Sequence, residues 1–386
     1  MRFMASGFAI GLTAVIGLCG CAVGPQGGVI GVYPVAAVGM SPDGNLIAAG
    51  TTIQGVAYLL DAQTLRIKAV LTTPTAVVDI QPTRGLPVTF SPDGKWVATA
   101  GMEDGVAAHI WDAETGKEIR RMAGVRGHRA LAFSPDGFRL ASSGPRNQIT
   151  VWDARDASVA KQWEAHGEAT IGIAFSRDGK LLISGGADRT LRFWSGEDFA
   201  SLGSIEGLPG DVTGVGFSPD GQHLAVAVAR REVRLYDASA RGAAAESRTL
   251  PPAPRERTSG DGSLSPLLQA VLWIGAIRSS RIVGAPTNIP PLGGAAPMSS
   301  GPARTLCDPN VSFSADGKRL AAVIEDGGLR IQITDLEKAS TVTTDRAIGC
   351  SVAFSPDGKF VVGGGMSAEV RLFDPASGHR LDLPGQ

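Results

Sequence analysis

Short apolar runs recur along this chain, and polar turns separate them. In "VAFSPDGKFVVGG", residues 352–364, Val352 and Phe354 share one face of an expected strand, and residues 360–362 begin a second, buried run. Within the turn, Pro presets φ, Asp bonds to nearby backbone and Gly supplies a positive φ. Ser-Pro-Asp-Gly therefore predicts a tight hairpin between two antiparallel strands.

The same turn recurs with a regular period. It begins at Ser41, Ser91, Ser134, Ser176, Ser218, Ser314 and Ser355, with spacings of 50, 43, 42, 42, 96 and 41 residues. A period just above 40 residues is typical of a repeat architecture. Each turn is followed by a second marker at Leu60-Asp61, Trp111-Asp112, Trp152-Asp153, Trp194-Ser195, Tyr236-Asp237, Thr334-Asp335 and Phe373-Asp374. A third strand such as "TLRFW" and a fourth such as "KEIRRMAG" complete four antiparallel strands per period.

These repeats resemble the WD40 repeats of β-propellers, and "HIWDAETGK" and "VWDARD" carry the Trp-Asp pair itself. The resemblance covers roughly residues 31–386. It implies an all-β, seven-bladed WD40-type β-propeller, whose closed ring leaves no long free sheet edge. The alternative is eight blades, with one degenerate blade in 253–306. Segment 379–383 and segment 28–35 both suit the closing blade, so either end of the chain could close the ring.

The resemblance also implies a structural tetrad in the fourth repeat, formed by His166, Ser184, Asp188 and Trp194. A buried His bonded to Ser and Asp is similar to a hydrolase triad, but in this fold the group cross-links strands within a blade. We therefore expect a structural role. The third repeat keeps the Ser and Trp, has Arg146 at the Asp position, and has His128 at a spacing that does not fit.

An insertion of Pro-rich sequence lies at about 253–306, between the fifth and sixth turns. Its centre, "LSPLLQAVLWIGAI", suits a short helix that begins at Ser265 and Pro266. One interpretation is that the insertion packs on the propeller or is a decayed blade. The other is an exposed element for a partner or a membrane. The candidate partner-binding residues are Leu267, Leu268, Val271, Leu272 and Trp273.

The first residues, "MRFMASGFAIGLTAVIGLCGCAVG", are typical of an export signal. Their end resembles the lipobox of bacterial lipoproteins, which implies a signal peptide at 1–20, lipidation of Cys21, and a linker at 21–30. The alternatives are an uncleaved membrane anchor and simple secretion. Acyl chains would anchor the protein to the bacterial cell envelope, facing the periplasm. In a Gram-negative host, Ala22 after the cysteine favours the outer membrane.

Two further cysteines, Cys307 and Cys350, lie 43 residues apart, close to one repeat length. An exported protein can form disulfides, so these two are a candidate pair, with two free thiols as the alternative.

Composition excludes several classes of function. With 36 basic and 37 acidic residues the chain has no electrostatic footprint for nucleic acid. No phosphate loop, His-Glu-x-x-His or Gly-x-Ser-x-Gly motif occurs, so we expect no catalytic residues, no metal and no cofactor. The favoured function is a non-catalytic scaffold for unidentified envelope proteins. The alternative is a propeller enzyme or small-molecule binder, lactonase-like or quinoprotein-like.

Overall fold

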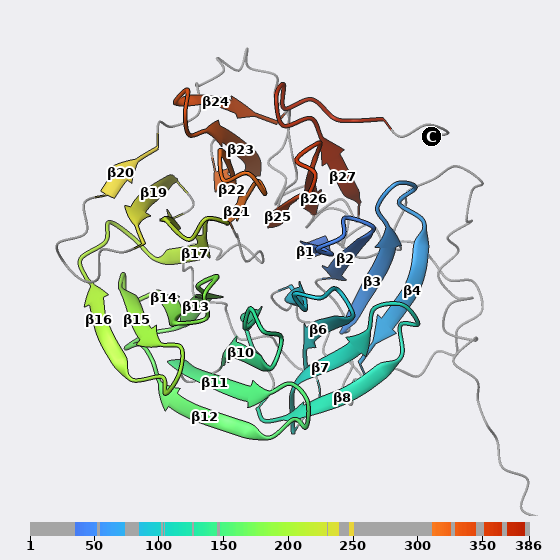
Figure 1. Ribbon diagram of the computed structural model, residues 1–386, viewed down its shortest axis with the longest axis vertical. Helices are drawn as coiled ribbons and strands as arrows, with labels where there is room; N and C mark the ends of the chain where they lie inside the picture. The colour runs from blue at the N-terminus through green and yellow to red at the C-terminus, as the bar shows by residue number, and fades with distance from the viewer. Residues whose placement is uncertain are drawn as a thin grey trace, which may run out of the picture.

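The computed structural model describes residues 35–51, 55–73, 85–101, 103, 105–125, 127–144, 147–229, 231–238, 247–250, 311–325, 329–344, 351–364 and 369–382. Within these ranges the regular elements are β-strands, arranged in seven antiparallel sheets. Six sheets have four strands and the last has three. Each sheet is one blade of a ring (Figure 1).

The first four blades follow chain order, and each runs from its innermost to its outermost strand. Their strands are β1 Val35–Met40, β2 Leu46–Thr51, β3 Val56–Asp61 and β4 Ile67–Thr72 in blade one; β5 Val88–Phe90, β6 Trp96–Ala100, β7 Val106–Asp112 and β8 Glu118–Ala123 in blade two; β9 Ala130–Phe133, β10 Arg139–Ser143, β11 Gln148–Asp153 and β12 Val159–Glu164 in blade three; β13 Thr170–Phe175, β14 Leu181–Gly186, β15 Leu191–Ser195 and β16 Ser201–Ile205 in blade four.

The last three blades continue the same order. Their strands are β17 Val212–Phe217, β18 His223–Val228, β19 Glu232–Asp237 and β20 Ser247–Thr249 in blade five; β21 Val311–Phe313, β22 Arg319–Glu325, β23 Leu329–Asp335 and β24 Ser340–Thr343 in blade six; β25 Ser351–Phe354, β26 Val361–Gly364 and β27 Val370–Phe373 in blade seven. The protein is thus an all-β, seven-bladed β-propeller, as the sequence predicts.

The core consists of seven apolar clusters, each shared by two consecutive blades. Every blade is therefore buried on both faces, which explains why strands such as β2 and β14 are buried along their whole length. The Trp of the repeat marker points towards the preceding blade: Trp194 of blade four packs with Ile149 and Val151 of blade three.

The seam between the first and last blades is packed like the other six boundaries. Strand β25 contacts β1, and Val35 and Val38 share a cluster with Val362 and Leu372. The Val38 main-chain N–H also donates to Ser351 Oγ over 3.1 Å. In the described part of the chain, the ring thus closes by packing between blades and not by a strand that two blades share.

The expected fourth strand of blade seven is present only in part. Arg380 pairs with Phe373, and the Leu381 N–H donates to the Leu372 carbonyl over 2.8 Å. The C-terminal segment therefore lies at the outer edge of β27. Segment 28–34 lies outside the described residues, so its expected role in closure stays a prediction.

All seven Ser-x-Asp-Gly turns have one geometry. The Ser hydroxyl accepts a hydrogen bond from the main-chain N–H five residues later, over 2.8–3.0 Å. The same hydroxyl donates to the turn aspartate, for example over 2.7 Å from Ser176 to Asp178. The turn glycine has φ between 69° and 77°, the left-handed region that favours glycine. The buried serine therefore satisfies the first main-chain donor of each second strand.

We expect Ser176→Ala to destabilise the protein by about 1–3 kcal/mol, because it leaves the buried Leu181 N–H without its partner. Equilibrium denaturation measures the change. Ser201→Ala is the matched control, because Ser201 is exposed on the outer strand of the same blade. Equal stability of the two variants would contradict the assigned role of the turn serine.

Candidate functional site

The four residues predicted as a tetrad lie together in blade four. His166 comes from the connection between β12 and β13, Ser184 from β14, Asp188 from the β14–β15 turn and Trp194 from β15. His166 Nε2 lies 2.8 Å from Ser184 Oγ, and His166 Nδ1 lies 3.0 Å from Asp188 Oδ1. Trp194 Nε1 donates to Ser184 Oγ over 2.9 Å. The four side chains thus form one continuous hydrogen-bonded chain.

The pKa shifts of His166 and Asp188 determine which groups donate and which accept in this hydrogen-bonded group. Burial lowers the pKa of His166, and the charge of Asp188 opposes that shift only in part. Burial acts to raise the pKa of Asp188, but hydrogen bonds from Thr190 and Gly167 outweigh it, so this pKa is lowered. At neutral pH a neutral imidazole therefore donates from Nδ1 to the carboxylate and accepts at Nε2 from the serine hydroxyl.

The surroundings leave no room for a substrate at this serine. Ser184 is fully buried, and its oxygen already accepts from the Trp194 indole while its proton goes to His166. Gly186 packs directly against the group: a Cβ there would lie 2.5 Å from both His166 Nδ1 and Asp188 Oδ1. A nucleophile must reach its substrate, so the geometry favours a structural cross-link between two strands, the turn that joins them and the preceding connection.

Blade three retains more of this arrangement than its sequence indicates. The interpretation that His128 does not fit was wrong, because His128 Nδ1 lies 2.7 Å from Ser142 Oγ. His128 lies two residues before β9, whereas His166 lies four residues before β13. His128 contacts its serine through Nδ1, and His166 contacts its serine through Nε2. Arg146 lies outside the described residues. Burial lowers the pKa of His128 to about 4.

Blade two has a different polar group, which the sequence did not reveal. Trp111 Nε1 donates to Thr99 Oγ1 over 2.9 Å, which replaces the Trp–Ser pair. Beside it, the fully buried His109 lies with its Nδ1 2.6 Å from Glu118 Oε1. The signal was the pairing of β7 with β8, which brings residues nine apart into contact across a hairpin.

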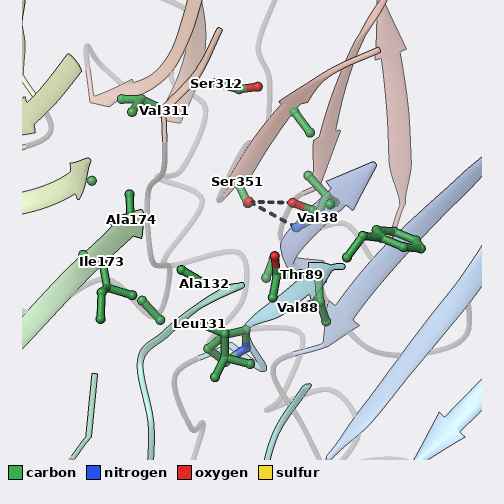
Figure 2. Close-up of a pocket in the computed structure, with 18 of the residues that line it drawn as sticks. Val38, Val88, Thr89, Leu131, Ala132, Ile173, Ala174, Val311, Ser312 and Ser351 are labelled. Carbon is green, nitrogen blue, oxygen red and sulfur yellow. Dashed lines mark hydrogen bonds between the residues drawn. The ribbon is translucent and has the colours of Figure 1, made fainter. Parts of the chain in front are cut away.

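A channel of about 430 Å³ runs along the ring axis and is lined by the inner strands (Figure 2). Its walls are mainly aliphatic and glycine residues, with labelled examples at Val38, Val88, Leu131 and Ile173. Among the described lining residues only Arg129 carries a titratable side chain. General acid–base chemistry needs positioned titratable groups, and this wall offers no pair of them.

Three hydroxyl groups of the channel wall bond to main chain and so serve the fold. Figure 2 shows Ser351 directed at the main chain of Val38, across the boundary between blades seven and one. Ser312 accepts from the Phe354 N–H over 3.0 Å, across the boundary between blades six and seven. Thr213 donates to the Ala227 carbonyl over 3.3 Å. These hydroxyls link neighbouring strands and blades.

Several sequence predictions fall outside the described residues. They are the lipidation site Cys21, the candidate pair Cys307 and Cys350, and the insertion residues Leu267, Leu268, Val271, Leu272 and Trp273. Over the ranges that the structure does describe, no helix has the length and apolar character to cross a membrane. In the same ranges no three His, Cys, Asp or Glu side chains gather in a way that could hold a metal ion.

Comparison with known families agrees with the fold. Four segments of the chain, residues 119–153, 158–195, 200–237 and 341–374, match the family described as WD domain, G-beta repeat. They fall in blades two to seven, and each ends at or beside the Trp-Asp type of marker.

Similar proteins share only part of their length with this chain. Over 123 residues it is 33% identical to Centriole proteome protein 16 of Chlamydomonas reinhardtii. The matched segment covers 31% of this chain and 5% of that protein. Over 91 residues it is 26% identical to Pre-mRNA-processing factor 17 of Homo sapiens and of Mus musculus. The matched segment covers 22% of this chain and 15% of those proteins.

We expect His166→Ala and Ser184→Ala each to lower the melting temperature, and the double variant to lose less stability than the sum of the two. The two side chains share one hydrogen-bonded chain, so a coupling of about 0.5–3 kcal/mol is expected from a double-mutant cycle. Thermal denaturation of the four proteins measures it. Additive losses would show that the two groups act independently.

We expect stability to fall as the pH is lowered from about 6.5 to about 4, and His128 to account for part of the fall. Its pKa is about 4 in the folded state, below the ordinary histidine value of 6.5, so the unfolded chain binds this proton first. The full stability is present above the unfolded pKa, and the loss reaches about 3 kcal/mol near pH 4. Urea titrations across this range should give a shallower pH dependence for His128→Gln than for the native chain. Parallel pH profiles would exclude the assignment.

Proposed function

The chain carries WD40 repeats in a seven-bladed β-propeller, and from this premise we propose that it is a non-catalytic protein-interaction scaffold held at the bacterial cell envelope by a lipidated Cys21. One observation carries the non-catalytic part. In the described residues, the buried polar side chains of the tetrad are bonded to one another. Ser351, Ser312 and Thr213 of the channel wall are bonded to main chain.

The propeller supports a scaffold role because its rigid core leaves connections and faces for contact with other proteins. The names of the relatives concern centrioles and pre-mRNA processing, but those matches span 15% or less of the relatives' length. Their biology is therefore not assigned to this chain. The partners that we propose are other envelope proteins, which the fold does not identify.

The anchoring rests on the sequence of the first residues. A charged residue at Arg2, an uncharged stretch and small residues before Cys21 suit processing as a lipoprotein. Two or more acyl chains hold a protein stably at a membrane, whereas a single chain does not. In a Gram-negative host we propose the outer membrane, with the propeller in the periplasm.

Replacing Cys21 with Ala tests the anchor. We expect the variant to lose incorporation of labelled palmitate and to leave the membrane fraction, because no acyl chain is attached. Cys19→Ala is the matched control and should retain both properties. Label that persists in Cys21→Ala and disappears in Cys19→Ala would place the lipid on the other cysteine.

Affinity capture from crosslinked envelopes tests the scaffold role, with protein that contains or lacks residues 255–303. We expect the intact protein to retain a defined set of envelope proteins. Loss of some of them from the deletion variant would assign those contacts to the insertion. Recovery of no partner, together with a melting temperature raised by a small molecule, would favour the propeller enzyme instead.

A further inference from the structure

Four charged or titratable side chains form a group at one end of blade two, which we call the blade-two cluster: Glu103, His109, Glu118 and Arg121. His109 lies on β7 and is fully buried. Glu118 and Arg121 lie on β8, where Arg121 Nε and Nη2 donate to the two Glu118 oxygens over 2.8 and 2.9 Å. Glu103 comes from the β6–β7 connection, with its Oε1 3.5 Å from Arg121 Nη1.

The contact with Glu118 fixes one proton of His109. An ionised carboxylate only accepts hydrogen bonds, so Nδ1, 2.6 Å from Glu118 Oε1, carries hydrogen. The Glu118 carboxyl remains ionised: burial acts to raise its pKa, but hydrogen bonds from Arg121 and His109 outweigh burial and lower it. The protonation of the other ring nitrogen, Nε2, is therefore the open variable of the cluster.

Nε2 faces a second carboxylate. It lies 4.0 Å from Glu103 Oε1, and in the described structure both atoms are buried without a hydrogen-bond partner. If Nε2 lacks a proton, its lone pair faces a negative charge, and the cluster has two carboxylates against one guanidinium. If Nε2 carries a proton, an N–H faces the carboxylate and the four charges balance. Burial of unpaired charge is costly, so the protonated form holds Glu103 in place more firmly.

We propose that His109 is a proton-operated latch for Glu103, which lies between β6 and β7. With hydrogen on both ring nitrogens, His109 bridges Glu118 on β8 and Glu103 in the connection. When Nε2 loses its proton, Glu103 keeps only its contact with the half-exposed Arg121 and is held less firmly. The Val106 N–H donates to the Glu103 carbonyl over 3.4 Å. Hydrogen exchange of the Val106 amide therefore shows whether Glu103 is held in place.

Given the groups around His109, the proton on Nε2 decides whether Glu103 is held. Glu118 and Arg121 face it from β8 and Glu103 from the connection; its neighbour on β6, Thr99, has no titratable group and bonds to Trp111. The Trp111 ring stacks on the imidazole with centroids 5.5 Å apart. By strand alternation, the β6–β7 connection lies on the same face of the ring as the connections between blades. The pH therefore determines how firmly the latch holds Glu103 on that face.

Nuclear magnetic resonance of the full propeller tests the latch. Imidazole nitrogen shifts follow the proton on Nε2, and amide hydrogen exchange follows the protection factor of Val106. When Nε2 loses its proton as the pH is raised, we expect protection of Val106 to fall about fivefold, as for the loss of a partly buried ion pair. The reference is the Arg231 amide, which donates to the Val228 carbonyl over 3.1 Å in the same connection of blade five, and which should not change.

Two variants sharpen the result. Glu103→Gln should abolish the pH step at Val106, because a neutral amide does not respond to the charge of the ring. Glu232→Gln, the matched change in blade five, should leave the step intact. Three results would each overturn the latch: Nε2 without hydrogen wherever the protein is folded, loss of the Nε2 proton with no change at Val106, or an unchanged step in Glu103→Gln. If Glu103→Gln does not fold, the nitrogen shifts and the Val106 exchange of the native chain, measured across the pH series, decide alone.

Discussion

Burial of both faces of every blade is the constraint on which this structure depends. An isolated four-stranded sheet of this sequence would expose two apolar faces, and each of the seven clusters needs residues from two consecutive blades. A linear stack would leave two outer faces open to water. Closure of β25 against β1 removes them, so the ring is an energetic requirement of the apolar pattern.

Polar groups in the interior bond to main-chain donors and connections that burial on both faces removes from water. A strand that is buried on both sides still has main-chain donors at its ends, and the turn serines satisfy one in every blade. The tetrad of blade four cross-links the connection that enters the blade to its second and third strands. Blade three keeps a His–Ser pair and blade two a Trp–Thr pair, so the cross-link is complete in one blade and partial in its neighbours.

The sequence predicts most of the fold because its strongest signals are local. Ser-x-Asp-Gly sets a hairpin by the φ of one glycine, and the Trp-Asp pair marks the third strand, so number and order of blades follow from counting. The tetrad was accessible because His166, Ser184 and Asp188 keep the family spacing. His128 was missed because it lies two residues before its strand, where His166 lies four, so it departs from the family spacing although its ring still reaches the serine. His109 was missed because its partner Glu118 lies across a hairpin, and Ser351 because its partner lies in the first blade, more than 300 residues away.

The boundary between blades seven and one has the same kinds of contact as every other boundary, and in the described residues no strand is shared across it. The packing therefore does not distinguish blade one from the other blades. The order in which the blades are synthesised need not start at any particular position in the ring. The architecture is cyclic even though the polymer is linear, so in physical terms the start of the chain could be moved to another boundary between blades while every apolar layer stayed as it is.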